Sequence, residues 1–214
     1  MDLVRFKIKP LLGIVRGIEL GQLEPVLASA IAGGLETLEI TMNTARAPEL
    51  IARASEIAAG KLTIGAGTVL DLDDLNSATD AGATFIVSPT LVPEVVAACV
   101  EARIAVFPGA LTPQEIHDAW RAGASMVKVF PAGFFGPSYF SEIKGPFANI
   151  ELLACGGVSA STLGDYARCG ADAFAFGGSV FNLDWIRAGH YDRIEAAIRK
   201  LVAALPSDGQ PATG

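Results

Sequence analysis

The chain has 214 residues, of which 51% are hydrophobic and only 18% are charged. This length and composition exclude intrinsic disorder and predict one packed domain, over residues 1–205. The formal net charge of -7 makes nucleic acid and anionic membranes poor partners, because both require a basic surface. An anionic ligand would have to be held by a few local donors, so we expect a pocket as the functional site.

The cysteines and the N-terminal residues indicate the cellular compartment of the protein. Cys99, Cys155 and Cys169 are widely spaced and form no C-x-x-C pair, which is typical of a reducing compartment rather than of a disulfide framework or a zinc site. Residues 1–10 lack the long apolar run of a secretory signal, and no stretch reaches the roughly 18 uninterrupted apolar residues of a membrane span. We therefore expect a cytoplasmic protein.

Short apolar runs rich in β-branched residues recur along the chain, separated by longer Ala-rich segments with polar residues at helical spacing. Their starts lie about 20 to 26 residues apart, the length of one strand, one three-turn helix and two loops. The pattern predicts eight strand-helix units. The strands are expected at residues 11–17, 37–42, 62–69, 85–89, 105–109, 126–131, 151–157 and 173–179.

Turn and cap residues mark the helix boundaries. The segment from Thr112 to Glu115 has the pattern of a capping box with proline at the first helical position, and Asp71 opens a similar acidic start. Helix ends are expected at the glycines of four similar phrases, where left-handed backbone would lead into the next strand. These phrases are AGG (32–34), AGA (81–83), AGA (122–124) and CGA (169–171).

The fold class follows from the strands. Strands that are apolar throughout belong to parallel sheets covered by crossover helices, and eight such units close into a (β/α)8 TIM barrel, an α/β fold. The alternative is a doubly wound open sheet, which would normally carry a G-x-G-x-x-G turn after its first strand. Residues 13–17, GIVRG, do not supply that turn. We expect residues 206–214 to form a mobile tail.

Two charged residues stand inside otherwise apolar strands, Lys128 and Glu39. Burial disfavours the charged form of a lysine and yields a nucleophilic amine. If Lys128 and Glu39 lie close together, each explains why the other stands in an apolar strand. They could form a structural ion pair, or they could be an amine and a carboxylate poised to move protons. The residues themselves leave these two interpretations open.

Other candidates lie where strands end, and in such barrels the carboxyl ends of the strands carry the site. Arg16 closes the first strand and can bind a carboxylate with two parallel hydrogen bonds, although a solvated or capping role is open. Asn43 follows the second strand and Thr68 closes the third. Gly-Gly pairs follow the seventh and eighth strands, a common place for phosphate, although such pairs also simply turn a chain.

Several polar residues are better interpreted as structural. His117 and His190 stand at no strand end, so surface or packing roles are expected for both. No pattern of His, Asp or Glu at strand ends predicts a metal site. Cys155 reaches the site loop but has no evident histidine base, which argues against thiol catalysis.

The ordered set of motifs closely resembles the family of 2-keto-3-deoxy-6-phosphogluconate and 2-keto-3-deoxy-6-phosphogalactonate aldolases, which includes 4-hydroxy-2-oxoglutarate aldolases. Each motif is weak alone, but together they are specific and span about residues 11–182. The motifs are LEIT (38–41), IGAGTV (64–69), VSP (87–89), VKVFP (127–131), GGV (156–158) and GGS (177–179).

The resemblance implies a class I aldolase, a lyase that needs no metal or other cofactor and is usually a homotrimer. It implies that Lys128 forms a Schiff base with the substrate ketone and that Glu39 transfers protons. Further positions match the pocket of the family: Thr68, Pro89 and Phe130 would shape the pyruvate site, and Gly156, Gly157, Gly178 and Ser179 would bind phosphate.

Two positions depart from the gluconate-type pattern, which has arginine where Asn43 stands and threonine where Cys155 stands. The first change makes Arg16 the better candidate for binding the substrate carboxylate, and the second removes a hydroxyl near the C4 end. The galactonate-type pattern matches both positions better, together with the RGI phrase (16–18) and the FGP segment (135–137). The resemblance therefore favours the galactonate epimer over the gluconate epimer and 4-hydroxy-2-oxoglutarate.

Two other functions use the same residues. A sugar-phosphate isomerase would employ Lys128 as an electrostatic stabiliser without a covalent adduct. A non-catalytic protein that binds phosphorylated ligands would keep Lys128 and Glu39 as a structural ion pair. Ligand binding without turnover would identify the second of these.

Overall fold

In the computed structural model, residues 1–206 are described, so the predicted tail lies, apart from Pro206, outside the described residues. Nine parallel strands form one sheet in the described part, in the order β5-β4-β3-β2-β1-β9-β8-β7-β6. They are β1 (Leu11–Val15), β2 (Thr37–Thr41), β3 (Thr63–Gly67), β4 (Phe85–Val87), β5 (Ala105–Phe107), β6 (Gly109–Ala110), β7 (Val127–Val129), β8 (Leu152–Cys155) and β9 (Ala173–Phe176).

The two outer strands of that order, β5 and β6, follow each other directly along the chain. They flank Pro108 and together take the place of one strand, so the nine strands close into a ring with eight positions. The predicted (β/α)8 barrel is therefore confirmed. The fifth predicted run, 105–109, is wrong in one respect, because it is two short strands. Proline has no N–H for the sheet ladder, and β5 pairs with β4 while β6 pairs with β7.

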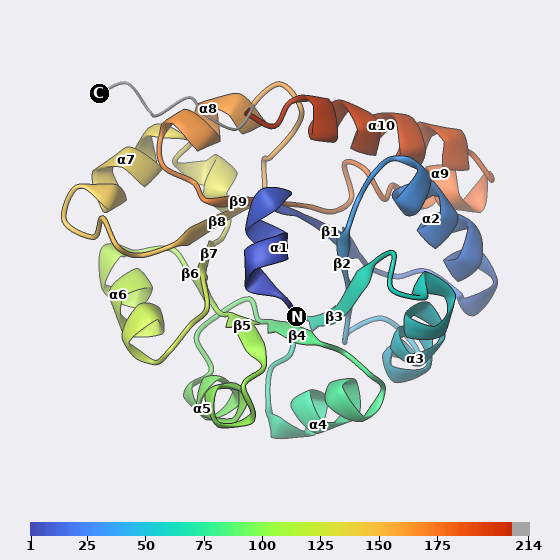
Figure 1. Cartoon of the computed structure of the whole chain (residues 1–214), viewed down its shortest axis with the longest axis horizontal. Coiled ribbons are helices and arrows are strands. Elements are labelled where there is room, and N and C mark those ends of the chain that lie inside the picture. The colour runs from blue at the N-terminus through green and yellow to red at the C-terminus, as the bar shows by residue number, and fades with distance from the viewer. Residues whose placement is uncertain (207–214) are drawn as a thin grey trace.

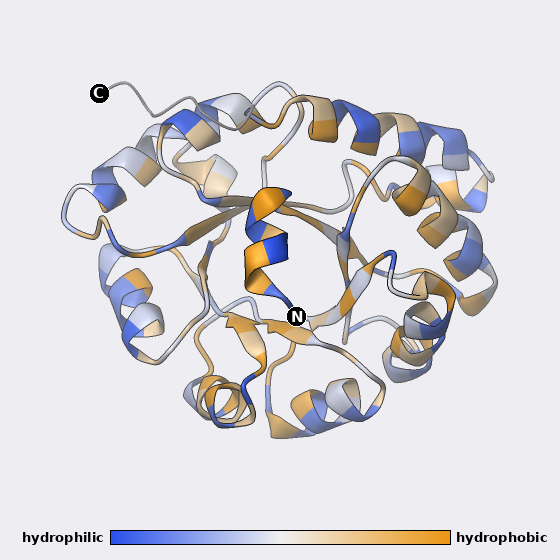
Figure 2. Cartoon of the chain, viewed as in Figure 1, coloured by the Kyte–Doolittle hydropathy of each residue, from blue (hydrophilic) through white to orange (hydrophobic). Residues whose placement is uncertain are grey.

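A ring of helices covers the outside of the barrel (Figure 1). Their apolar sides face the strands and their polar sides face solvent (Figure 2). In the last helix, for example, Ile194, Ile198 and Leu201 are buried at helical spacing. The ring consists of α2 (Leu20–Ala32), α3 (Ala47–Ala58), α4 (Leu72–Asp80), α5 (Pro93–Ala102), α6 (Pro113–Arg121), α7 (Ser138–Lys144), α8 (Leu163–Arg168) and α10 (Tyr191–Ala203).

The predicted helix boundaries are confirmed by local hydrogen bonds. Thr112 N donates to Glu115 Oε2 (2.8 Å) and Glu115 N donates to Thr112 Oγ1 (3.3 Å), which is the capping box before α6. Asp71 accepts from the backbone of Asp74 at the start of α4. The four predicted helix ends all have a glycine at positive φ, at positions 34, 82, 123 and 170.

A short helix that the sequence pattern does not predict, α1 (Leu3–Ile8), closes the amino-terminal end of the barrel. It lies across the centre of the ring in Figure 1. Phe6 is buried in the barrel and stacks on Phe107, with 5.9 Å between ring centroids. Ion pairs tie α1 to the rim, from Lys7 to Glu151 (2.5 Å) and from Lys9 to Glu36 (2.8 Å). Access to the barrel interior is therefore left to the carboxyl ends of the strands.

Two further elements that the sequence reasoning missed stand at the carboxyl ends. They are a short 3-10 helix, η1 (Ala132–Phe134), after β7 and a five-residue helix, α9 (Leu183–Arg187), after β9. Both lengthen the loops around the mouth of the barrel. Within the described residues, no helix is apolar and long enough to cross a membrane.

Gly65 on β3 gives a direct test of the packing inside the barrel. A Cβ at this position would lie 2.4 Å from the ring of Phe85, which is fully buried. We expect Gly65→Ala to lower the free energy of unfolding by about 1–3 kcal/mol, the usual cost of overpacking a core. Urea denaturation measures this change.

Gly21→Ala is the matched control, because a Cβ at Gly21 meets nothing within 4 Å on α2. That substitution should be neutral or stabilising by up to about 1 kcal/mol, since alanine favours helix. Equal stability of Gly65→Ala and the wild type would contradict the packing described here.

Candidate active site

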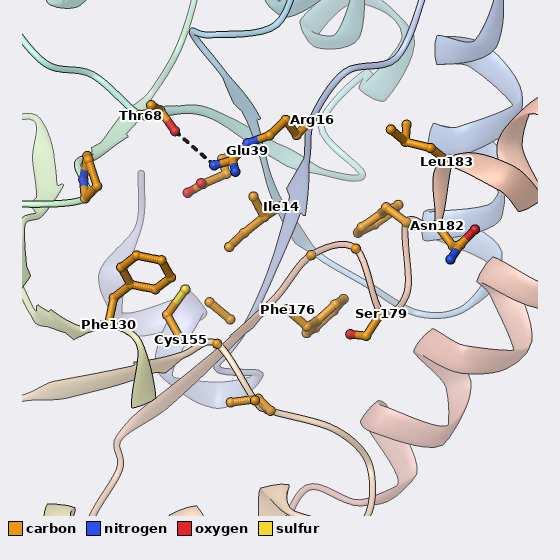
Figure 3. Close-up of a pocket in the computed structure, with 18 of the residues that line it drawn as sticks. Ile14, Arg16, Glu39, Thr68, Phe130, Cys155, Phe176, Ser179, Asn182 and Leu183 are labelled. Atoms are coloured by element: carbon orange, nitrogen blue, oxygen red, sulfur yellow. Dashed lines mark hydrogen bonds between the residues drawn. The ribbon is translucent and has the colours of Figure 1, made fainter. Parts of the chain in front are cut away.

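A cavity of about 920 Å³ opens at the carboxyl ends of the strands. Its wall is formed by residues at the ends of β1, β2, β3, β4, β7, β8 and β9 and by α9 (Figure 3). The cavity brings together all twelve site residues that the sequence predicts. They are Arg16, Glu39, Asn43, Thr68, Pro89, Lys128, Phe130, Cys155, Gly156, Gly157, Gly178 and Ser179.

Lys128 is held in the middle of β7 with 7% of its surface exposed. Its backbone N–H donates to the carbonyl of Pro108 (2.9 Å), and its ammonium lies 5.1 Å from the ring centroid of Phe130. Among the described residues, no carboxylate oxygen lies within 4.0 Å of its Nζ. A direct ion pair with Glu39, one of the two interpretations of the sequence, is therefore wrong for this conformation.

Glu39 projects from β2 and is 1% exposed. Its Oε2 is buried and has no hydrogen-bond partner in the described structure. The carboxylate lies over Gly67 of β3, where an added Cβ would stand 2.1 Å from Oε1. Gly67 thus provides the room that the Glu39 side chain occupies.

Burial changes the acidity of Glu39. Desolvation raises the pKa of its carboxyl to about 7, against the opposing effects of the Lys128 and Arg16 charges. A carboxyl group with such a pKa is present in both protonation states near neutral pH. It can therefore both accept and donate a proton, as a general acid-base catalyst must.

Arg16 and Thr68 meet across the cavity mouth. Arg16 Nη2 donates to Thr68 Oγ1 at 3.3 Å, the dashed line in Figure 3. Thr68 has φ of 56°, a left-handed conformation that is strained for a β-branched residue and typical of functional sites. In the described part of the chain, no carboxylate lies within 4.0 Å of the Arg16 guanidinium, so its other donors are available to a ligand.

Backbone loops line the other side of the cavity. Gly156 (φ 85°) and Gly157 (φ 89°) after β8 are both left-handed, and a Cβ on Gly157 would stand 2.8 Å from Gly133 Cα. Turn geometry and packing therefore explain these two glycines. Gly178 after β9 differs, because its φ is not positive and an added Cβ would meet nothing within 4 Å.

Cys155 ends β8 on the floor of the cavity. Burial raises the pKa of its thiol to about 11, with a smaller raising effect of Glu39 and smaller lowering effects of Lys128 and Arg16. The thiol is thus protonated at neutral pH, and it is a small apolar wall rather than a nucleophile.

The two histidines lie outside the cavity wall. His117 stacks on Phe147 with 5.3 Å between centroids, and His190 precedes α10. No group of three or more His, Cys, Asp or Glu residues in the described structure could hold a metal ion.

The cavity wall also contains residues that the sequence does not single out, among them Ile14, Asn182, Asp184 and Arg187. Asp184 and Arg187 lie on α9, and Asn182 is its N-cap, because Asn182 Oδ1 accepts from the backbone N–H groups of Asp184 and Trp185. The Asn-x-Asp pattern is a usable cap signal. It predicts the helix but not that the helix lies over the cavity.

Comparisons with known proteins agree with this architecture. A family model described as KDPG and KHG aldolase matches residues 4–197. The probable 2-dehydro-3-deoxy-6-phosphogalactonate aldolase of Rhizobium meliloti is 34% identical over 81% of the chain and 82% of that protein. The KHG/KDPG aldolase of Escherichia coli K12 is 34% identical over 83% of the chain and 84% of its own length. A solved structure described as native KDPGal is 29% identical, with a TM-score of 0.84, over 91% of this chain and 93% of that one.

The (β/α)8 barrel is the architecture that the solved KDPGal structure shares with the chain. The chain belongs to the KDPG and KHG aldolase family, so the resemblance seen in its motifs is confirmed.

The raised pKa of Glu39 predicts how stability depends on pH. The carboxyl titrates near 4.5 when unfolded and near 7 when folded, so between these values the folded protein holds a proton that the unfolded chain has lost. The free energy of unfolding should therefore fall as pH rises from about 4.5 to about 7. Glu39→Gln removes this loss. The free energy of unfolding of the variant should therefore rise relative to that of the wild type by on the order of 3 kcal/mol as the pH rises through that range.

Urea denaturation of both proteins at pH 5 and pH 8 measures the change. A stability difference between the two proteins that is the same at both pH values would show that Glu39 is not desolvated as described.

Proposed function

We propose that the protein is a class I aldolase that cleaves 2-keto-3-deoxy-6-phosphogalactonate to pyruvate and glyceraldehyde 3-phosphate. The observation that carries this proposal is the pairing of Lys128 and Glu39 in one cavity, both buried and not bonded to each other. A structural ion pair needs contact between its charges. An amine nucleophile and a proton carrier instead need a substrate between them.

The first half of the reaction forms the covalent link. The neutral amine of Lys128 attacks the C2 ketone, giving a carbinolamine that loses its hydroxyl as water with a proton from Glu39. The resulting iminium withdraws electrons from the neighbouring carbons. Lys128 Nζ lies over the Phe130 ring, 5.1 Å from its centroid, so Phe130 would limit the side from which the substrate ketone reaches the amine.

The second half breaks the C3–C4 bond. Glu39, directly or through a water, takes the proton of the C4 hydroxyl, and the bonding pair moves toward the iminium. Glyceraldehyde 3-phosphate leaves, and a pyruvate enamine stays on Lys128. A proton on C3 and a water at C2 then release pyruvate and restore the amine.

The rest of the cavity would orient the two ends of the substrate. Arg16 would bind the carboxylate with the guanidinium donors that Thr68 does not use, and Thr68, Pro89 and Phe130 would shape the pyruvate site. The loops with Gly156, Gly157, Gly178 and Ser179 would bind phosphate. Gly178 supports this assignment, because neither its backbone conformation nor its protein neighbours require glycine.

The choice of epimer depends on Asn43 and Cys155, both in the cavity wall. Because Asn43 is uncharged, Arg16 is the cation that would bind the substrate carboxylate. Cys155 has a thiol, so it presents no hydroxyl to C4 of the substrate. The relatives named above include both a galactonate and a KHG/KDPG aldolase. The second candidate substrates are therefore 2-keto-3-deoxy-6-phosphogluconate and 4-hydroxy-2-oxoglutarate, cleaved by the same mechanism.

We also propose that the protein acts as a homotrimer in the cytoplasm. A homotrimer is what the family resemblance implies, and exposed aromatic rings at Phe134 and Phe135 beside the mouth give an apolar surface for a second copy. One related structure is a cage designed by fusing symmetric oligomeric domains. The three free cysteines, of which two are buried, support a reducing compartment.

Trapping with borohydride tests the covalent mechanism. Pyruvate and borohydride should add one reduced pyruvyl group to the intact protein, and peptide mapping should place it on Lys128. Lys128→Ala should form no adduct, while Lys144→Ala should react as the wild type does, because Lys144 lies outside the cavity wall. An unmodified wild type at saturating pyruvate would leave an isomerase or a non-catalytic binding barrel.

Parallel assays of the two phosphorylated epimers test the substrate. We expect a higher kcat/KM for the galactonate form, and we expect Cys155→Thr to shift the ratio toward the gluconate form by about 10-fold or more, the typical effect of one polar contact. A wild type that prefers the gluconate form would overturn the choice of epimer but not the mechanism.

A further inference from the structure

A pair of buried threonine hydroxyls joins the loops that follow β1 and β2. Thr41 Oγ1 and Thr44 Oγ1 lie 3.0 Å apart, and the two residues are 0% and 4% exposed. Thr44 Oγ1 also accepts a hydrogen bond from the backbone N–H of Gly17, at 3.0 Å. The pair thus connects the end of β2 to the residue that directly follows Arg16.

The contact with Gly17 fixes the backbone beside Arg16. Gly17 has φ of 70°, so the chain turns sharply immediately after the arginine. In the described structure, Thr44 Oγ1 is the only hydrogen-bond acceptor of the Gly17 N–H. Gly17 is exposed and this hydrogen bond is partly buried, so loss of the hydroxyl would leave the N–H to water and remove the protein contact that fixes the turn.

Thr44 itself does not line the cavity, whereas Arg16 does. Among residues 1–206, Thr68 is the one hydrogen-bond partner of the Arg16 guanidinium, at 3.3 Å. Its near end is set by the backbone of residues 16 and 17. The direction of the guanidinium therefore depends on the Thr44 contact as well as on the Thr68 contact.

We propose that Thr44 is a positioning residue that aims Arg16 at the substrate carboxylate. The proposal rests on the proposed function, in which Arg16 binds that carboxylate. Thr41 supports this role, because the 3.0 Å hydrogen bond between the two hydroxyls fixes the Thr44 rotamer with its oxygen toward Gly17.

The experiment measures how the borohydride-trapped pyruvate adduct depends on pyruvate concentration. Thr44→Val keeps the shape of the side chain and removes the hydroxyl. We expect it to raise the half-saturating pyruvate concentration by roughly 5- to 30-fold, the coupling that neighbouring residues commonly show, with the limiting rate of adduct formation unchanged. Thr44→Ser retains the hydroxyl and should restore the wild-type value.

A double-mutant cycle with Arg16→Ala separates positioning from general destabilisation. Arg16→Ala alone should raise the half-saturating concentration, and Thr44→Val should add nothing further in that background. Ser29→Ala is the matched control, since it also removes a buried hydroxyl, bonded to the Pro25 carbonyl on α2 outside the cavity. It should change stability but not pyruvate affinity.

The outcomes distinguish the two proposals. An unchanged pyruvate affinity in Thr44→Val, or an equal loss with and without Arg16, overturns the role of Thr44 and leaves the aldolase proposal standing. A wild type that forms no adduct overturns both. If Thr44→Val does not fold, Thr44→Ala is measured in the same way, with the same expected loss.

Discussion

Closure of the parallel sheet is the constraint on which the site depends. Every strand in a parallel ring presents its carboxyl end at the same edge, so residues far apart in the chain, such as Arg16 and Lys128, line one cavity. The ring closes where the chain passes through Pro108, and the carbonyl of that residue accepts the backbone N–H of Lys128. The interruption between β5 and β6 therefore lies next to Lys128, the proposed nucleophile. The hydrogen bond to the Pro108 carbonyl holds the Lys128 backbone in place at this interruption.

The cavity places a carboxylate where burial destabilises its charge. Glu39 has little exposure, no hydrogen-bond partner for Oε2, and a wall at Gly67 that no other residue type could form without moving it. Such a group weakens the folded state at neutral pH. The surrounding barrel tolerates this because its strands and the ring of helices share a continuous apolar core. Stability and acid-base chemistry therefore make opposite demands on this one side chain.

Much of this could be predicted from the sequence, and the reasons are specific. Periodic apolar runs and glycine helix ends show the eight units, and Lys128 and Glu39 are recognisable because charged residues rarely stand inside apolar strands. The helix α1 could not be predicted in this way, since its six residues form no long periodic pattern and its partner is the distant barrel interior. The separation of Lys128 from Glu39 is a matter of side-chain conformation. The placement of Arg187 over the cavity depends on where α9 packs, and neither property leaves a local signal.

The helix α1 has a consequence for the order of events in the proposed reaction. In the described part of the chain, Phe6 and the rim ion pairs close the amino-terminal end of the barrel. The substrate and both fragments would therefore pass through the opening at the carboxyl ends of the strands. In the proposed reaction, the phosphorylated aldehyde would lie against the loops at that opening, while the three-carbon fragment would still be bonded to Lys128 deeper in the cavity. The aldehyde must therefore depart first, and in the synthetic direction pyruvate must enter first. The covalent chemistry requires the same order, because the three-carbon fragment stays bonded to Lys128 until the enamine is hydrolysed. The closed amino-terminal end adds a steric reason, since the second product can leave only through the opening that the first has cleared.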